Sequence, residues 1–289
     1  MPRERLDRES PTCAVCGSNV RTRGLIRALS LEVFGANLSL PDFPRVKSIR
    51  GLGIGDSPQY AGRLAEIFDY RNTFYTREPR LDITAPPEGE LGAYDFIVSS
   101  EVFEHIVAPV EKAFEAAFSL LKPHGVLLLT VPYSLAPGAT ERFAKLHQFG
   151  LAQVGDRVLL VNRAADGKIE VHEDLVFHFG SSGPVLEMRE FSESALRSGL
   201  AAAGFREIRI YSENEEAFGV VNAESWSLPI AARRGSFVFT REAAGDVLEQ
   251  WAALRKRRRE LAGSFWVRLA GKLGLVDLAP LLDRGRRRQ

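Results

Sequence analysis

Glycines at alternate positions form the stretch of the sequence best suited to contact a ligand through its backbone. Gly51, Gly53 and Gly55 are followed by Asp56, and Ser57-Pro58 is typical of a helix start, with serine as N-cap and proline at the first helical position. Glycines permit a tight turn close to a ligand, and the first turn of a helix leaves amide donors free. The stretch predicts a nucleotide-binding turn; the alternative is a turn that ends a strand without a ligand.

The acid at position 56 favours one kind of nucleotide. The dinucleotide-binding form of this turn has a third small residue where the sequence has Asp56. A carboxylate there would oppose a pyrophosphate docked at the helix N-terminus. A ligand with a cationic centre and no phosphate avoids that repulsion. S-adenosylmethionine, an adenosine that carries a sulfonium, is the common ligand of this kind, so the turn favours it.

The elements that position this turn are expected to be alternating strands and helices. Helices are predicted where apolar residues recur at helical spacing, and strands in short apolar runs. A first strand leads into Gly51, and further strands are expected at residues 72–76, 81–84, 94–100, 126–131, 206–211 and 235–240. Helices are expected at residues 25–34, 60–68, 109–121 and 192–204, with Gly35 and Gly204 as stops and Ser192 as an N-cap.

Two acids follow the second strand, at the edge of the sheet where ligands bind. Crossovers between parallel strands are short and right-handed, and ligands of open parallel sheets lie at the carboxyl ends of the strands. Glu78 comes just beyond the second strand and would accept both ribose hydroxyls of an adenosine. Asp82 would face the adenine amino group. The alternative for Glu78 is an exposed loop acid.

Two motifs further along the chain carry a family resemblance. The run from Tyr94 to His105 ends in Val-Phe-Glu-His, and the run from Leu120 to Pro132 contains Leu-Lys-Pro-His-Gly. In this order they resemble class I S-adenosylmethionine-dependent methyltransferases, and within them the bacterial branch with Val-Phe-Glu-His after the fourth strand. The resemblance covers residues 46–240. It implies an α/β fold: a Rossmann-like, doubly wound, seven-stranded, mostly parallel sheet whose last strand is antiparallel.

The resemblance also assigns residues to the cofactor, S-adenosylmethionine. It implies that the three glycines hold the methionine and ribose end, that Glu78 holds the ribose, and that the loop after the fourth strand lines the pocket near the methyl group through Ser100, Glu101 and His105. Most members carry an acid at the position of Gly51. Here Asp56 or Glu101 would have to supply that carboxylate.

An insertion at residues 134–190 interrupts the alternation and is expected to form the acceptor side of the site. Two strands at residues 157–163 and 168–171, joined by a turn at Asp166-Gly167, predict a β-hairpin. Methyl transfer to a hydroxyl needs a base, and the pKa of histidine suits that role. His172, with Asp174 as a partner, and His147 are the catalytic candidates; structural histidines are the alternative.

Outside this core, the sequence predicts two additions. Residues 1–45 form a cap segment with Cys13 and Cys16, residues 46–242 the methyltransferase domain, and residues 243–289 a basic amphipathic helical extension. No second cysteine pair completes a zinc site, so no metal ligands are assigned; a pair completed by distant histidines is the alternative. The basic extension would dock on the domain, contact another subunit or lie on an anionic membrane surface.

Composition agrees with a globular enzyme. The 289 residues are 45% hydrophobic and 26% charged, with a formal net charge of +1. The sequence has no apolar run long enough for a membrane span and no secretory signal, which predicts a cytoplasmic protein. The function predicted is O-methylation of a small molecule or of a sugar or glycan. The alternatives are methylation of RNA or protein through the basic tail, and a non-catalytic cofactor-binding scaffold, which the glycine at position 51 suggests.

Overall fold

The structure is a computed structural model that describes residues 8–10, 13, 17–180 and 183–264. The chain divides into two compact units. The larger comprises Met1–Phe43 and Ile49–Val238, and the smaller comprises Pro44–Ser48 and Phe239–Gln289. Among the described helices, none combines the length and apolar character needed to cross a lipid bilayer.

A six-stranded sheet forms the centre of the larger unit. Its strands, in spatial order, are β13 (Glu207–Ile210), β14 (Ile230–Arg233), β4 (Leu121–Thr130), β3 (Tyr94–Ser100), β1 (Arg50–Ile54) and β2 (Asp69–Thr73). The four strands β1 to β4 are parallel, and β14 is antiparallel to both of its neighbours. The predicted α/β, mostly parallel fold with an antiparallel last strand is therefore confirmed.

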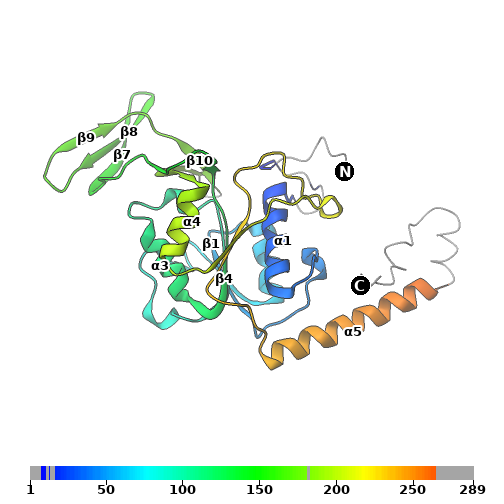
Figure 1. Ribbon diagram of the computed structural model, residues 1–289. Helices are drawn as coiled ribbons and strands as arrows, with labels where there is room; N and C mark the ends of the chain where they lie inside the picture. The colour runs from blue at the N-terminus through cyan, green and yellow to red at the C-terminus, as the bar shows by residue number, and fades with distance from the viewer. Residues whose placement is uncertain (1–7, 11–12, 14–16, 181–182, 265–289) are drawn as a thin grey trace. The chain divides into compact units, whose positions relative to one another are not determined.

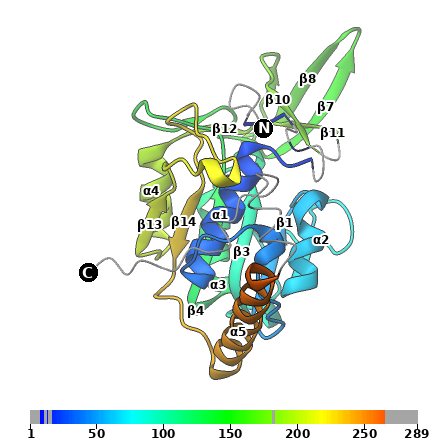
Figure 2. The same ribbon diagram turned by 90° about the vertical axis from the view of Figure 1, so that its right-hand side faces the viewer.

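Helices cover both faces of this sheet. On one face lies α1 (Val20–Phe34), and on the other lie α3 (Glu111–Leu120) and α4 (Glu193–Ala202), as Figures 1 and 2 show. Between β1 and β2 the chain forms α2 (Pro58–Ile67). Short 3-10 helices are η2 (Leu40–Asp42), η3 (Glu88–Glu90), η4 (Phe103–His105) and η5 (Glu216–Phe218).

The predicted helix ends are confirmed where local chemistry sets them. The Ser57 side chain accepts a hydrogen bond from the Gln59 amide at the start of α2, and Ser192 caps α4 in the same manner. Gly35 adopts a left-handed conformation, with φ 63°, directly after α1. Each of these helix ends is set by a few neighbouring residues, so it can be predicted from the sequence alone.

Apolar side chains of the central strands point alternately to the two faces of the sheet and form a core on each face. Leu52, Ile97 and Leu127 face α3 and α4 and belong to one buried apolar cluster. The opposite face holds an aromatic group in which the ring centroids of Phe68 and Phe96 are 5.0 Å apart and Tyr70 stacks on Phe96 at 5.9 Å. Burial of each such side chain contributes about 1.5–3 kcal/mol to the stability of the fold, so packing on both faces stabilises the sheet.

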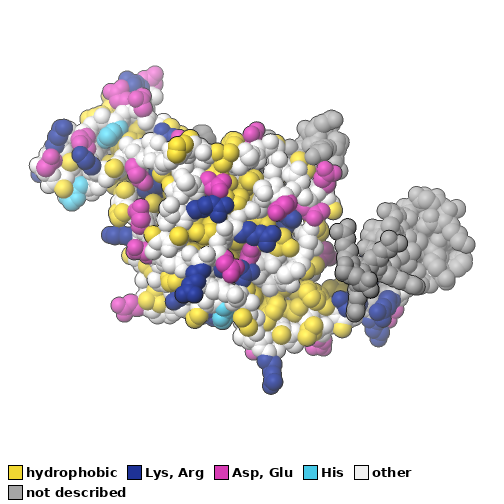
Figure 3. Space-filling model, in the orientation of Figure 1, with side chains coloured by type: hydrophobic (Ala, Val, Ile, Leu, Met, Phe, Trp, Pro, Cys, Tyr) yellow, Lys and Arg dark blue, Asp and Glu magenta, His cyan; other side chains and the backbone are white. Residues whose placement is uncertain are grey.

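The insertion after β4 builds three small β structures. A three-stranded sheet contains β5 (Tyr133–Ser134), β12 (Arg189–Ser192) and β6 (Thr140–Glu141); an antiparallel sheet contains β7 (Gln148–Val154), β8 (Arg157–Arg163) and β9 (Ile169–His172); a hairpin contains β10 (Phe177–Gly180) and β11 (Gly183–Leu186). The predicted hairpin is β8 and β9. Figure 1 shows β7 to β9 extending away from the central sheet, and Figure 3 shows charged side chains over this segment.

Three strand predictions differ from the structure, one of them only in its bounds. Residues 81–84 form a loop in which Asp82 Oδ1 accepts hydrogen bonds from Thr84, so the central sheet within the described chain has six strands and not seven. The strand predicted at residues 72–76 is β2, which begins at Asp69, directly after α2. The strand predicted at 235–240 is β14, at Ile230–Arg233. Its alanines have weak strand propensity, whereas the later Phe-Val-Phe-Thr run has strong propensity.

The smaller unit contains α5 (Arg241–Gly263), which Thr240 caps through the Ala243 amide. Gln250 on this helix exchanges two hydrogen bonds, of 2.7 and 2.6 Å, with the backbone of Arg45. The basic run from Arg255 to Arg259 is exposed. The predicted helical positions Phe265 and Leu269, the arginines at the end of the chain and Cys16 lie outside the described residues.

Candidate active site

The glycine turn leaves β1 at the edge of the sheet where the parallel strands end. Gly55 has φ +70°, and its amide donates to the Thr73 carbonyl at 2.8 Å. A Cβ at Gly55 would lie 3.3 Å from Val102 Cγ2. The turn therefore needs glycine for its backbone conformation, and it brings β1 close to the loop that follows β3.

The other two glycines lie under protein side chains. A Cβ at Gly51 would lie 2.7 Å from Tyr70 Cδ2 and would collide with the Phe96 ring. A Cβ at Gly53 would lie 2.7 Å from Asp56 Oδ2. A carboxylate at position 51 has no room beneath these two rings, which gives a physical reason for the glycine at this position.

Asp56 is a buried carboxyl group with a complete set of donors. It is 1% exposed and accepts hydrogen bonds from the hydroxyl groups of Tyr60, at 2.7 Å, and Tyr70. Asn72 fixes its backbone from both sides, at 3.0 and 2.9 Å. Burial raises the pKa of Asp56 to about 7, although the two tyrosine hydrogen bonds and the Arg21 charge act to lower it.

The loop after β3 presents two of the predicted cofactor residues. Ser100 Oγ lies 3.0 Å from Thr130 Oγ1 at the end of β4 and accepts a hydrogen bond from Arg21. Glu101 has φ 55°, which is uncommon for a residue with a side chain, and its carboxylate accepts from Arg8 at 3.2 Å. The structure therefore brings Ser100 and Glu101 to the edge of the sheet where Gly55 lies.

Two arginines from the beginning of the chain reach the same loop. Arg21 pairs with Glu9 at 2.9 Å, and Arg8 donates to the Ser227 carbonyl at 3.1 Å. Burial acts to lower the pKa of Arg21, but the charges of Glu101 and Glu9 outweigh it and the pKa is raised. The Arg21 guanidinium is thus a permanent positive charge at the carboxyl end of β3.

A second buried carboxyl group follows in η4. Glu104 is fully buried, and within the described chain no side chain or amide of another residue donates to its carboxylate oxygens. Burial, with the nearby Glu101 charge, raises the pKa of Glu104 well above its usual range. Two imidazoles lie beside it: His105 Nε2 is 3.7 Å and His178 Nδ1 4.0 Å from Glu104 Oε1. Burial lowers the pKa of His105.

Ion pairs connect this cluster to the insertion. Arg142 donates to Glu187 at 2.8 and 3.0 Å, and Glu187 lies 2.8 Å from His178 Nε2. A parallel link runs through Arg189, which is 1% exposed, binds the Glu141 carboxylate and donates to the Phe103 carbonyl at 2.8 Å. The inserted segment is therefore joined to the loop after β3 by charged contacts.

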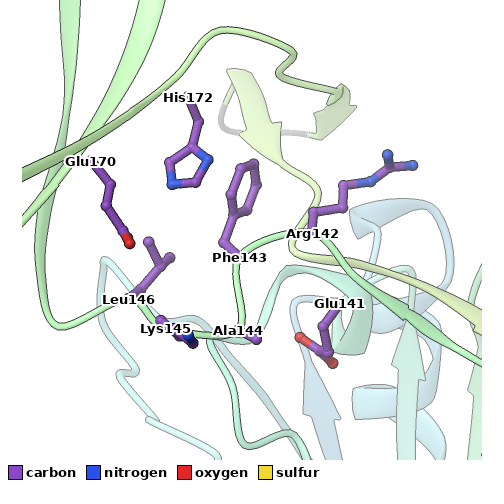
Figure 4. A pocket seen from close by; sticks show the side chains of 8 residues that line it. All are labelled: Glu141, Arg142, Phe143, Ala144, Lys145, Leu146, Glu170 and His172. Carbon is purple, nitrogen blue, oxygen red and sulfur yellow. The ribbon is translucent and has the colours of Figure 1, made fainter. Parts of the chain in front are cut away.

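His172, a predicted catalytic residue, lines a cavity of about 250 Å³ in the insertion. Its ring packs edge-on against Phe143 at 5.1 Å, and Glu170 points toward the same space while Arg142 points away, as Figure 4 shows. Charged, polar and apolar residues line the cavity, and more of its lining surface is apolar than polar: Glu141, Arg142, Phe143, Ala144, Lys145, Leu146, Glu170 and His172. Such a mixed lining suits a ligand that has both polar and apolar groups.

His147, the other predicted catalytic residue, is exposed and lines a second cavity, of about 390 Å³, with Lys145 and Asp166. Its backbone amide donates to Asn162 Oδ1 at 2.9 Å. Glu78 is exposed, and its carboxylate accepts from the Arg80 amide at 2.9 Å. Asp82 is half-buried in the loop that replaces the predicted third strand.

Several residues of this region were not assigned a role from the sequence. They are Arg8, Arg21, Glu104, Glu187 and His178; the segment of His178 was expected to lie near the pocket. Glu104 belongs to the Val-Phe-Glu-His motif and directly precedes His105, a predicted site residue, so it could have been identified from the motif. The others reach the site from distant segments, and no local pattern marks them.

The sheet, the glycine turn and the polar loop after β3 are together typical of α/β enzymes, whose nucleotide-like cofactors bind at the carboxyl ends of the strands. A family model described as "Methyltransferase domain" matches residues 56–209, more than half of the 289 residues. The chain belongs to this family and is a class I S-adenosylmethionine-dependent methyltransferase. No curated protein matches the sequence significantly.

Three solved structures illustrate the range of similar proteins. The 1,6-didemethyltoxoflavin-N1-methyltransferase of Burkholderia thailandensis is 13% identical, with 75% of this chain and 78% of that chain covered and a TM-score of 0.40. CalS10, an amino pentose methyltransferase from Micromonospora echinaspora, is 15% identical, with coverages of 75% and 92% and a TM-score of 0.40. The CurJ carbon methyltransferase is 15% identical with a TM-score of 0.45; the alignment covers 76% of this chain and 56% of that one.

The residues at the carboxyl end of β3 are complementary in charge to the methionine end of S-adenosylmethionine. That end carries a carboxylate and an ammonium group. Arg21 provides a half-buried positive charge, and Glu101 provides a carboxylate whose side chain is 19% exposed. Gly55 directly follows the adjoining strand β1 and is exposed. These groups are complementary to a zwitterion.

Proposed function

We propose that the enzyme methylates an oxygen atom of a small polar acceptor, such as a sugar-like molecule. The observation that carries this proposal is the charged network from Glu141 and Arg142 in the insertion to Phe103 and Glu104 after β3. It joins the cavity lined by His172 to the edge of the sheet where we expect the cofactor. The charged side chains of this cavity would hold the hydroxyl groups of an acceptor by hydrogen bonds, and its apolar surface would pack against the rest of the acceptor.

Attack by a hydroxyl group requires a proton acceptor near the oxygen. His172 is our proposed base, because it lines this cavity and has Phe143 to fix its ring. His147 is a second proposed base, on the rim of the neighbouring cavity. For the cofactor, we propose that Arg21 binds the carboxylate and Glu101 the ammonium group. Gly55, Ser100 and His105 would line the pocket, Gly51, Gly53 and Asp56 would hold the turn in shape beneath it, and Glu78 and Asp82 would contact the ribose and adenine.

The test is methyl transfer from isotopically labelled S-adenosylmethionine to a panel of hydroxylated and aminated small molecules. We expect an O-methylated product, identified by mass spectrometry and NMR. Replacement of the proposed base, His172→Ala, should lower kcat by about 100-fold or more. Labelling of amines alone, labelling of RNA or protein alone, or cofactor binding without turnover on any acceptor would contradict the proposal.

A further inference from the structure

Three side chains with metal-ligating atoms meet beyond the end of β3. Glu104 and His105 come from η4, and His178 comes from β10 in the insertion. One ligand atom of each lies within 4.8 Å of the others. Glu104 is fully buried, and the side chains of His105 and His178 are 14% and 35% exposed. The cluster is thus closed on the Glu104 side and open on the His178 side.

Neighbouring oxygen atoms place the proton of each imidazole on the nitrogen that faces away from Glu104. His105 Nδ1 lies 2.9 Å from the Leu186 carbonyl, which only accepts, so Nδ1 carries the proton and Nε2 is free to bind a cation. His178 Nε2 lies 2.8 Å from Glu187 Oε2, an ion-pair distance that favours a proton on Nε2, and Nδ1 lies 4.0 Å from Glu104 Oε1. A ring nitrogen held by a carbonyl or carboxylate while the other faces inward is the usual arrangement of metal-binding histidines.

The orientation of these groups leaves Glu104 without a donor. Two imidazole lone pairs face a buried carboxyl group that receives no hydrogen bond from another residue of the described chain. When Glu104 is ionised, three acceptors face one another, which is unfavourable because a buried acceptor loses its hydrogen bonds to water. A cation between them removes this conflict for all three at once.

We propose that Glu104, His105 and His178 bind one divalent transition-metal ion, with Glu187 orienting His178. Two imidazoles and a carboxylate suit ions such as Zn²⁺, Mn²⁺, Co²⁺ and Fe²⁺. Bonds of about 2.1 Å place two ligand atoms at most about 4.2 Å apart. The separations of 3.7 and 4.0 Å from Glu104 Oε1 meet this limit. The ligand atoms of the cluster as a whole lie within 4.8 Å of one another, so the two imidazoles would move slightly closer together around an ion.

Three protein ligands leave positions of the ion open toward the insertion. An acceptor oxygen bound there would lose its proton more readily, because a metal ion lowers the pKa of an oxygen that it binds. This role of the ion rests on the proposed function. Binding of the ion does not, and it is measured without any acceptor.

The test is titration of the chelator-treated, full-length protein with Co²⁺, followed by visible absorption, and with Zn²⁺, followed by calorimetry. We expect one ion per chain at this site. The variants Glu104→Gln and His178→Ala should weaken binding at least 100-fold. Glu187→Gln should weaken it 10- to 100-fold, as for other residues that orient a ligand.

Matched control variants test whether the metal ion binds at the cluster of Glu104, His105 and His178. His172→Ala and His147→Ala remove histidines from the same insertion but outside the cluster, and should bind the ion as the wild type does. Circular dichroism establishes that each variant is folded; His178 is partly exposed, so its alanine variant should fold. Absence of binding at millimolar metal, or binding that Cys13→Ser abolishes and His178→Ala leaves unchanged, would overturn the proposal.

Discussion

Two buried carboxyl groups at the same edge of the sheet have opposite surroundings. Asp56, after β1, accepts hydrogen bonds from Tyr60 and Tyr70, and Asn72 holds its backbone. Glu104, after β3, is buried as completely but receives no donor from another described residue and faces two imidazoles. Burial raises the pKa of both.

This difference in hydrogen bonding distinguishes a carboxyl group that stabilises the fold from one that binds a ligand. A carboxyl group whose hydrogen bonds are complete stabilises its own surroundings, and Asp56 holds the turn between β1 and α2 in this way. A carboxyl group without donors destabilises the chain by itself, since its desolvation is not compensated. We infer that Glu104 serves a ligand, whereas Asp56 serves the fold.

The largest expected effect at a single pH comes from disturbing the Asp56 group. In Gly53→Ala the new Cβ would lie 2.7 Å from Asp56 Oδ2 and from Asn72 Oδ1. We expect the free energy of unfolding to fall by about 3 kcal/mol, measured by urea denaturation, because these neighbours are buried and tightly packed. The control is Gly62→Ala in α2. A Cβ there meets nothing within 4 Å, so this variant should raise the free energy of unfolding by about 0.5–1 kcal/mol. A Gly53→Ala protein of wild-type stability would refute the close packing around Asp56.

The next effect is a pH dependence that Asp56 alone should cause. Its pKa is near 4 in the unfolded chain and about 7 in the folded one, so between these values the folded state binds the extra proton. Stability from this group is therefore complete below pH 4 and declines as the pH rises to 7. Relative to Asp56→Asn, the wild type should lose on the order of 4 kcal/mol over that range. A pH-independent difference between the two proteins would contradict this account.

Removal of a single donor should have a smaller effect. Tyr60→Phe deletes one hydrogen bond to Asp56 and should lower the free energy of unfolding by about 1–2 kcal/mol. Tyr75→Phe provides the matched control, because Tyr75 is 64% exposed and its change should have little effect. Equal stability of both variants in thermal denaturation would mean that the Tyr60 hydroxyl does not support Asp56.

The smallest effect on stability is expected at Glu104. Glu104→Gln keeps the shape of the side chain and adds an amide that donates to the free lone pairs of His105 or His178. Without added metal, we expect the free energy of unfolding to stay equal or to rise by up to about 1 kcal/mol. A loss as large as that of Tyr60→Phe would place Glu104 with Asp56 among the structural groups.

These contrasts also explain how much the sequence could predict. β3 was expected at residues 94–100 and occupies them, because a short buried apolar run needs no distant partner to be recognised. Ser57, Ser192 and Gly35 likewise act through their immediate neighbours. By contrast, β14 is a short run with two alanines, and only its pairing with β4 makes it a strand.

The candidate site was predicted in part for the same reason. Ser100, Glu101 and His105 adjoin one strand, so a motif could identify them together. His178 and Arg21 reach that loop across the fold, through contacts that no local spacing encodes. Glu104 was visible in its motif, but its lack of donors is a property of the folded chain.

The most direct test of the division between Asp56 and Glu104 is carboxyl ¹³C NMR of the aspartate- and glutamate-labelled protein during titration with Zn²⁺. The Asp56→Asn and Glu104→Gln variants would assign the two resonances. We predict that the Glu104 signal shifts until one equivalent of Zn²⁺ has been added, while the Asp56 signal stays in place. A Glu104 signal that does not respond, or a shift of both signals together, would contradict the assignment of one carboxyl group to the fold and the other to a ligand.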